Sequence, residues 1–562
     1  MPAHPPLTRA AHLLLIAVFA VLWFGNLDYR KLVRPDEGRY AEIPREMVVT
    51  GNWLTPRLNA IKYFEKPPLQ YWATAAAYKA FGEHEWTARL WPALTGFAGV
   101  LFACFIGAAL FGATTGLYAA LVLATSMGYM FVAHLATLDM GFTFFMMLAM
   151  GGFLLGLSDR PPERTRRRWI YLAWIGMALA VLSKGLAGIV LPLLVLGVYV
   201  VLQRDWGLTR KLRPISGGLL FLAIAAPWFI AVSAVNPEFP SFFFIHEHFA
   251  RFLTNVHHRV APWWYFFPIL ALGMLPWLIP MLDALRQAWR QPSVGGLHAG
   301  RFLLIWSVVT FAFFSASSSK LPSYILPLVP ALALLIAMRL AAITIRGLRL
   351  NAALYVLLGV ALFLLAPQAP RFARDGLDLD LFAAYVPWLR AAAAVIVAGG
   401  AAAWLWSSHR PRAAVLAIAC SALIAEQALM MGHDELARRS SFYYMAQQVR
   451  PYLRSDMPLY SVGTYEQTLP FYLKRTTTLV AFADEMAYGL KQEPGLWLED
   501  IAAFERIWRD TDHAMAVMPP YVYERLVRDG LPMTVLARNA RLVVAMRSAP
   551  DTKDTAAGKA NT

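Results

Sequence analysis

The sequence is poor in cysteine and in charged residues. Cys104 and Cys420 are its only cysteines among 562 residues, and both lie inside apolar blocks, so neither an extramembrane disulfide nor a thiolate metal cluster is expected. Charged residues make up 15% of the chain and hydrophobic residues 58%. Typical soluble domains are about one quarter charged. This composition excludes an ordinary soluble domain and indicates a membrane protein.

Apolar residues recur in blocks of roughly 18–25, which is the length of helix that crosses about 30 Å of hydrocarbon. We therefore predict an all-α polytopic membrane domain, with the first block retained as a span rather than cleaved as a signal peptide. The thirteen expected spans lie near residues 11–27, 86–112, 114–135, 139–157, 169–184, 187–202, 215–234, 264–281, 302–316, 323–338, 351–366, 384–406 and 413–431.

Basic residues are concentrated in short loops between these spans. The net charge of +16 thus favours arginine facing the cytoplasm and contact with membrane lipids, and it gives no support for nucleic-acid binding. With thirteen crossings and a cytoplasmic N-terminus, all the basic loops fall on the cytoplasmic side. The shorter block 69–82 contains Lys79 and is predicted to be an amphipathic helix on the membrane surface. The basic loops are 158–168, 204–213, 286–301, 339–349 and 410–412.

The same topology divides the chain into domains. A membrane domain is expected over 1–431, with its first outer loop at 28–85. From Gly432 the sequence carries more charge and more alternation, which predicts a small α/β domain over 432–548 on the outer face. Residues 549–562 have the composition of a disordered tail.

Polar residues gather in the first outer loop, close to the end of the first span. Carboxylates beside cations and tyrosines at a lipid interface suit a reaction on a lipid-linked phosphate, because cations hold phosphoryl oxygens and a carboxylate handles a proton or a positive charge. The alternative is a solvated, salt-bridged loop. The residues concerned are Asp36, Glu37, Arg39, Tyr40, Tyr63, Glu65 and Lys66.

Further ionisable residues interrupt apolar sequence at span ends assigned to the same outer face. These are Asp139, Lys184, Lys320 and the neighbouring Tyr324. Burying such groups in a membrane costs roughly a few kcal/mol each, so they usually face an internal cavity. Each alone could be an anchor that extends to the interface. Because all of them are assigned to the outer face of the membrane, as the Asp36 loop is, a cavity shared with that loop is favoured.

A second outer loop, 235–263, contains closely spaced histidines around Glu247. His246 could bind a divalent cation together with Glu65, although such histidines more often form hydrogen bonds at the interface. Arg251 in the same loop could hold a phosphate. We therefore expect no definite cofactor, and a divalent cation is the alternative.

The motifs RPDEGRYAEIPREMVVTGNWLTPRLN and YFEKPPLQYW, with TLDMGF, LSKG and SSSKLPSYILP, resemble membrane glycosyltransferases that use polyprenyl-phosphate sugars. Their C-type fold is shared with protein O-mannosyltransferases. The motifs are most similar to those of the bacterial 4-amino-4-deoxy-L-arabinose lipid A transferases. The resemblance covers the chain from the first to about the tenth span.

The resemblance implies that Asp36 is the catalytic carboxylate. It also implies an undecaprenyl-phosphate-linked aminosugar as donor, a lipid A phosphate as acceptor, inversion at the anomeric carbon, and resistance to polymyxin. Lys66, Lys184 and Arg251 would then hold phosphates, and Tyr40, Tyr63 and Glu65 would line the sugar pocket. We expect a monomer in the bacterial inner membrane with its active site and C-terminal domain in the periplasm. Arg39, Asp139, Lys320 and Tyr324 complete the expected substrate site.

Two other functions are compatible with the residues. One is transfer of mannose or another neutral sugar from a polyprenyl phosphate to protein or to a different lipid. The other is transport of a lipid-linked sugar, which would place charge near the middle of the membrane and often involves repeated halves. The sequence shows no such repeat, and its polar residues gather at one face, which favours an enzyme.

Overall fold

The computed structural model of the protein describes residues 9–250, 261–373 and 376–547, and these form two compact units. The helical unit consists of the chain up to Tyr29, 64–368 and 386–433. The loop unit consists of 30–63, 369–385 and the chain from Asp434 onward. Most of the first outer loop therefore belongs to the same unit as the C-terminal segment, and the sequence-based domain boundaries stay predictions.

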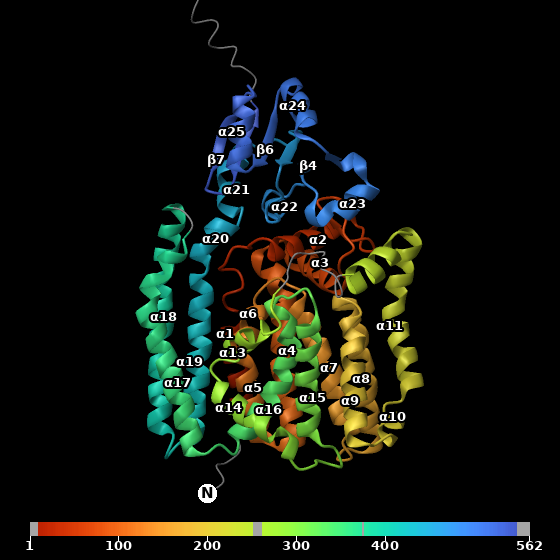
Figure 1. Ribbon diagram of the computed structural model, residues 1–562, viewed down its shortest axis with the longest axis vertical. Helices are drawn as coiled ribbons and strands as arrows, with labels where there is room; N and C mark the ends of the chain where they lie inside the picture. Colours follow the sequence, from red (N-terminus) through yellow and green to blue (C-terminus); the bar gives the residue numbers. More distant parts are fainter. Residues whose placement is uncertain (1–8, 251–260, 374–375, 548–562) are drawn as a thin grey trace, which may run out of the picture. The chain divides into compact units, whose positions relative to one another are not determined.

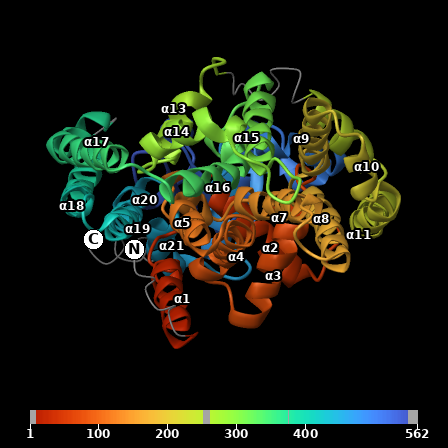
Figure 2. The ribbon, with the colours of Figure 1, turned by 90° about the horizontal axis from the view of Figure 1, so that it is seen from below.

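The helical unit is built around a closed ring of packed helices, seen from one end in Figure 2. In the ring, α4 packs between α5 and α7, α8 follows α7, and α9, α15 and α16 lead back to α5. Buried alanine, leucine, methionine and phenylalanine fill the core. The ring helices are α4 (Glu85–Phe111), α5 (Ala113–Ala124), α7 (Asp139–Leu157), α8 (Glu163–Lys184), α9 (Ala187–Gln203), α15 (Ala299–Ala316) and α16 (Val329–Leu340).

Other helices of this unit lie around the ring or in its connections. Two of them, α17 and α18, pack closely enough that a β-carbon on Gly359 would lie 2.7 Å from Ile396. These elements are α1 (Arg9–Phe24), α3 (Leu69–Phe81), α6 (Met127–Ala133), α10 (Gly207–Lys211), α11 (Pro214–Val235), the π-helix η1 (Ser241–Ala250), α13 (Phe266–Gly273), α14 (Leu278–Gln287), η2 (Ala288–Arg290), η3 (Pro322–Leu328), α17 (Ile345–Leu365), η4 (Ala366–Phe372), α18 (Gly376–Trp406) and α19 (Pro411–Gly432), of which η4 and α18 continue into the loop unit.

Glycines allow α7 and α8 to pack unusually closely. A β-carbon on Gly176 of α8 would lie 2.7 Å from the Ala149 nitrogen of α7, and one on Gly152 would lie 2.9 Å from the Trp169 carbonyl oxygen. Small residues commonly let membrane helices approach in this way. Because the helices pack along each other in opposite directions, the first residue of α7 meets the last residue of α8.

The expected all-α membrane fold is confirmed. Among the described residues, eight helices are long and apolar enough to cross a membrane, or up to ten if each bent pair is one span. The bent pairs are α5–α6, at 65°, and α13–α14, at 113°. The other expected spans correspond to α1, α8 and α9, which are helical but shorter or more charged. The count of thirteen stays a prediction. The segment predicted as a surface helix is α3, and its position on the membrane surface also stays a prediction.

Three of the basic loops meet at one end of the helical unit. The Asp159 amide donates to the Gly295 carbonyl at 2.8 Å, and the Asp159 carboxylate lies 3.3 Å from the Lys211 ammonium. Arg213 lies 3.1 Å from Glu163. The prediction that these three loops share one side is therefore confirmed.

The loop unit contains a six-stranded mixed sheet with strand order β5-β4-β3-β6-β8-β7, drawn in blue in Figure 1. Strands β3 to β6 run parallel, and β8 pairs antiparallel with both β6 and β7. The predicted small α/β domain is confirmed. Its elements are α20 (Asp434–Ser440), α21 (Tyr443–Val449), η5 (Arg450–Tyr452), β3 (Leu459–Val462), α22 (Leu469–Leu473), β4 (Thr478–Val480), η6 (Asp484–Met486), α23 (Ala487–Gln492), η7 (Pro494–Leu496), β5 (Trp497–Leu498), α24 (Ile501–Asp510), β6 (Ala514–Met518), α25 (Pro520–Arg528), β7 (Thr534–Arg538) and β8 (Val543–Arg547).

The same unit holds the first-loop helix α2 (Asp36–Thr50) and a hairpin of β1 (Arg57–Leu58) and β2 (Ile61–Lys62). The hairpin turns through Asn59 and Ala60, both with positive φ, as a two-residue turn between twisted strands requires. The Asn59 side-chain amide exchanges two hydrogen bonds, of 2.7 and 2.8 Å, with the Thr477 backbone. The first loop is therefore fixed to the start of β4.

Candidate active site

The two adjacent carboxylates of the first loop have different environments. Glu37 is buried and accepts a hydrogen bond of 3.1 Å from the Val33 amide, so it stabilises the start of α2. Asp36 is the first residue of α2, and its side chain is 49% exposed. A carboxylate at a helix N-terminus is stabilised by the helix dipole. Of the pair, Asp36 is therefore the carboxylate that a substrate can reach.

Arg39 holds Asp36 in place. Its guanidinium donates to the Asp36 carboxylate at 2.9 Å and also pairs with Glu485, while the Arg39 side chain is 9% exposed. Gln467 donates to the other oxygen of Glu485 at 3.0 Å. These two ion pairs give Arg39 a positioning role beside Asp36, and its predicted role in substrate binding stays a prediction.

The motif glycine Gly38 is required by packing. A β-carbon at this position would lie 2.5 Å from the Gln467 carbonyl carbon, which is backbone and cannot move aside cheaply. This close approach brings α2 against the segment before α22. It explains why a small residue follows Asp36 and Glu37.

Further along α2 lies a buried charged cluster that sequence reasoning missed. Arg45 donates to both Glu42 oxygens, at 2.7 and 2.6 Å. Glu46 accepts from the amides of Asn59 and Ala60, at 2.5 and 2.9 Å. Burial, followed by the proximity of Glu42, raises the pKa of Glu46 to about 8. Glu46 therefore ties the helix to the hairpin turn.

Tyr40 and Tyr63 also belong to the loop unit, and both are buried. The Arg39 guanidinium lies 5.7 Å from the centre of the Tyr40 ring. The Tyr63 amide donates to the Pro56 carbonyl at 2.9 Å. These contacts give both tyrosines a packing role, and their contribution to a sugar pocket stays a prediction.

In the helical unit, Lys66 meets a carboxylate from the second outer loop. Its ammonium lies 3.3 Å from Glu247, whose side chain is 1% exposed, and 3.9 Å from the Glu65 carboxylate. His246 lies 3.7 Å from the other Glu247 oxygen. Glu247 was considered only as the residue between two histidines, yet it is the residue that links this loop to Lys66.

The possible metal ligands of this cluster are few. Within the described ranges, no group of three or more histidine, cysteine, aspartate or glutamate side chains could hold an ion. The nearest carboxylate to His246 is the one that pairs with Lys66. The expected binding of a cation by Glu65 and His246 stays a prediction. Arg251 lies outside the described residues.

Asp139, Lys184 and Tyr324 come together as the sequence suggested. Lys184, the last residue of α8, pairs with Asp139, the first residue of α7. The Lys184 ammonium lies 4.7 Å from the centre of the Tyr324 ring and 5.7 Å from that of Phe142. Lys320, in contrast, is buried and donates to the Ser317 carbonyl at 2.6 Å, so its part in a shared cavity stays a prediction.

The start of α3 links these polar groups. Gln70 follows Lys66 by four residues, and a β-carbon on Gly141 in the first turn of α7 would lie 3.8 Å from its side-chain oxygen. The Lys66 end of α3 therefore lies beside the Asp139 end of α7. Asp36 belongs to the other unit, and its convergence with these lysines stays a prediction.

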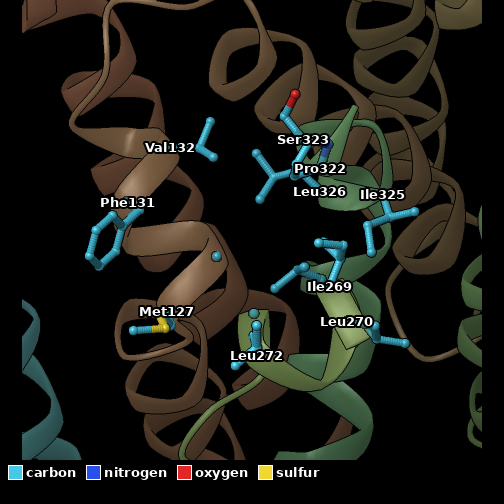
Figure 3. Close-up of a pocket in the computed structure, with 13 residues that line it drawn as sticks. Met127, Phe131, Val132, Ile269, Leu270, Leu272, Pro322, Ser323, Ile325 and Leu326 are labelled. Carbon is cyan, nitrogen blue, oxygen red and sulfur yellow. The ribbon is translucent and has the colours of Figure 1, made fainter. Parts of the chain in front are cut away.

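An apolar cavity of about 260 Å³ lies next to the Tyr324 segment (Figure 3). Phe131 from α6, Leu270 from α13, and Ile325 and Leu326 from η3 are among its lining residues. Because η3 also carries Tyr324, the same short helix borders both the cavity and the Lys184 cluster. A hydrocarbon chain suits such a lining, and phosphate suits the neighbouring cation.

Two family models match the chain. Residues 10–246 match the model described as dolichyl-phosphate-mannose-protein mannosyltransferase, and residues 445–547 match the aminoarabinose transferase C-terminal domain. An undecaprenyl phosphate-alpha-4-amino-4-deoxy-L-arabinose arabinosyl transferase of Erwinia tasmaniensis is 31% identical over 70% of this chain and 73% of its own length. The chain belongs to the aminoarabinose transferase family.

Other members of the aminoarabinose transferase family are also similar. The Pseudomonas fluorescens transferase 2 is 34% identical over 63% of this chain, and the match spans 61% of that relative's length. The crystal structure of ArnT from Cupriavidus metallidurans bound to undecaprenyl phosphate is 37% identical, with a TM-score of 0.92, over 97% of this chain and all of that one. The chain thus shares the family and the fold of these multi-pass membrane glycosyltransferases.

Proposed function

We propose that this family member transfers 4-amino-4-deoxy-L-arabinose from undecaprenyl phosphate to phosphate groups of lipid A, at the periplasmic face of the inner membrane. The observation that carries the proposal is the near full-length similarity to a transferase crystallised with undecaprenyl phosphate. The polar clusters around Asp36, Lys66 and Lys184 supply the charges that such a reaction uses. Resistance to polymyxin follows from the positive charge added to lipid A.

In the reaction, a lipid A phosphate oxygen attacks the anomeric carbon of the sugar. The bond between that carbon and the undecaprenyl phosphate oxygen breaks, and undecaprenyl phosphate leaves with the bonding electrons. A phosphate monoester has a second pKa of about 6, so the acceptor is already largely ionised at neutral pH. The enzyme therefore needs no strong base, and one displacement inverts the anomeric carbon.

In this reaction Asp36 interacts with positive charge on the sugar and does not act as a strong base. A half-exposed carboxylate can stabilise the positive charge that develops at the anomeric carbon, or orient the protonated amine of the sugar. Arg39 and Glu485 keep it in one orientation. Glu65, beside Lys66, provides a second carboxylate for the amine.

The lysines bind the phosphates. The Lys66 ammonium lies 3.3 Å from Glu247 and 3.9 Å from Glu65, and the Lys184 ammonium pairs with Asp139. A bound phosphate competes with these carboxylates for the two ammonium groups. A phosphate carries more charge than a carboxylate and accepts more hydrogen bonds. The apolar cavity beside η3 accommodates part of a lipid chain. Arg251 is a further phosphate ligand in this proposal.

Mass spectrometry of lipid A from cells with and without the protein tests both substrates together. We expect an increment of one pentosamine per modified phosphate, and its loss in the Asp36→Asn variant. Unmodified lipid A together with newly glycosylated protein would instead support the mannosyltransferase-like alternative. A redistributed but chemically unchanged lipid-linked sugar would support a transporter.

A further inference from the structure

The end of the helical unit where the three basic loops meet contains a cavity of about 240 Å³. Gly156 at the end of α7 and Ile170 in α8 are its apolar lining residues. The lining also includes cationic side chains from the start of α8, from α10 and from the residue before α11. The cations are Arg166, Arg167, Arg210, Lys211 and Arg213.

Carboxylates neutralise only part of this charge. Glu163 lies 2.7 Å from Arg166 and 3.1 Å from Arg213, and Asp159 pairs with Arg166 and lies 3.3 Å from Lys211. Five cations thus share two carboxylates, which leaves an excess of three positive charges.

Two of the cations remain available for a ligand. Among the residues that the structure describes, Arg167 and Arg210 form no ion pair. A guanidinium binds phosphate through paired hydrogen bonds, and two of them on one cavity form a good anion site.

The wall that carries Arg213 is held by tight packing. Arg213 has φ 51° and ψ 55°, a left-handed conformation that is unfavourable for a residue with a β-carbon. The Trp174 indole of α8 donates to the neighbouring Leu212 carbonyl at 3.0 Å. Gly217 allows α11 to approach the same indole, where a β-carbon would clash. The side of the cavity that carries Arg213 is therefore held by the packing of α11 against α8.

The surroundings favour a lipid over a soluble anion. The cavity lies at the ends of apolar helices, where lipid headgroups are found. Its outer helix, α11, leaves Ile215, Leu219 and Leu222 exposed, so acyl chains would contact that helix in a membrane. Drug-sized ligands occupy roughly 300–1,000 Å³, so this smaller cavity suits a single headgroup. We propose that it binds the phosphodiester headgroup of an anionic phospholipid.

The site is distant from the proposed reaction along α8. Arg166 and Arg167 lie in its first turns, whereas Lys184 is its last residue, about 26 Å away at 1.5 Å per residue. Lipid binding can therefore be tested apart from sugar transfer. The informative variant is Arg167→Gln with Arg210→Gln, because it removes two cations and breaks no ion pair among the described residues. The matched control is Arg164→Gln with Arg168→Gln, which removes the same number of charges from α8, at two positions that do not line the cavity.

The experiment incubates delipidated, full-length protein with vesicles of phosphatidylglycerol in phosphatidylcholine, or of phosphatidylcholine alone. Retained lipid is then counted by native mass spectrometry. We expect the wild type and the control to retain phosphatidylglycerol, and the cavity variant to bind it roughly tenfold or more weakly, since each basic side chain near an anionic headgroup contributes about fivefold.

Equal loss of lipid from the cavity variant and the control would overturn the proposal, because it would indicate a diffuse attraction of the whole basic surface. Displacement of the lipid by inorganic phosphate at similar concentration would also overturn it, since the ligand would then be a soluble phosphate. Retention of phosphatidylglycerol by the cavity variant at wild-type level would exclude the site.

Discussion

The loop unit and the helical unit present charges of opposite sign. In the loop unit, Asp36 is half exposed and its cationic partner Arg39 is buried, so a carboxylate faces outward. In the helical unit, Glu247 is buried and its partner Lys66 is the more exposed of the two, at 14%. The buried member of each pair orients the accessible one. This contrast suggests that the loop unit acts on the sugar and the helical unit holds the phosphates.

The largest expected effect comes from removing the accessible carboxylate. Asp36→Asn keeps the shape of the side chain and its place at the helix start but loses the charge. We expect turnover to fall about a thousandfold, as when other preorganised electrostatic groups are removed. An assay of the variant with purified donor and lipid A measures this fall in turnover. Full activity of the folded variant would show that Asp36 has no catalytic role.

Removing the accessible cation should weaken binding instead. Lys66→Met keeps the aliphatic stem and removes the ion pair with Glu247. We expect affinity for undecaprenyl phosphate to fall roughly tenfold to a hundredfold, the usual range for a lost charge-assisted hydrogen bond. Titration with undecaprenyl phosphate checks this. An unchanged affinity would remove Lys66 from the phosphate site.

A smaller effect is expected where a carboxylate acts through Arg39. Glu485→Gln removes the charge that holds Arg39 beside Asp36, and we expect turnover to fall about tenfold with little change in KM. Glu485→Asp keeps the charge and should therefore lose less turnover than Glu485→Gln. The matched control is Glu493→Gln, because Glu493 pairs with Arg57 at 3.0 Å in the same unit and has no contact with Asp36 among the described pairs. Equal losses in both variants would indicate a general loss of structure.

The smallest effect concerns stability and pH. Glu46 has a pKa of about 8 in the folded protein against an ordinary value of 4.5, so the folded state holds this proton more tightly than the unfolded state. Its contribution to stability is complete below the ordinary pKa and is lost as pH rises toward 8. We expect the Tm of the wild type to decline over this window and the Tm of Glu46→Gln to decline less. Parallel curves of Tm against pH for the two proteins would show that Glu46 does not cause the decline.

The fold was largely predictable because its causes are local in sequence. Apolar block length predicts the helices of the ring, and the arginine bias groups loops that the structure does bring together at Asp159. Asp139 and Lys184 stood out for the same reason, since a charge that interrupts an apolar run is conspicuous. The C-terminal sheet followed from alternating apolar residues.

The partners of the site residues could not be predicted in the same way. Glu485 is 449 positions from Asp36, and Glu247 is 181 from Lys66, so no periodicity or spacing connects them. The sequence shows that Arg39 is near a carboxylate, but it does not show that Arg39 pairs with both Asp36 and Glu485. Gly38 shows the same limit. The backbone that leaves no room for a side chain there belongs to Gln467, which is far away in the sequence.

Binding of undecaprenyl phosphate to Asp36→Asn and Lys66→Met, measured side by side on folded protein, tests the division of labour between the units most directly. We predict wild-type affinity for the aspartate variant, despite its lost turnover, and clearly weaker binding for the lysine variant. The reverse pattern, with binding lost at Asp36 and kept at Lys66, would contradict the assignment of sugar chemistry to one unit and phosphate binding to the other.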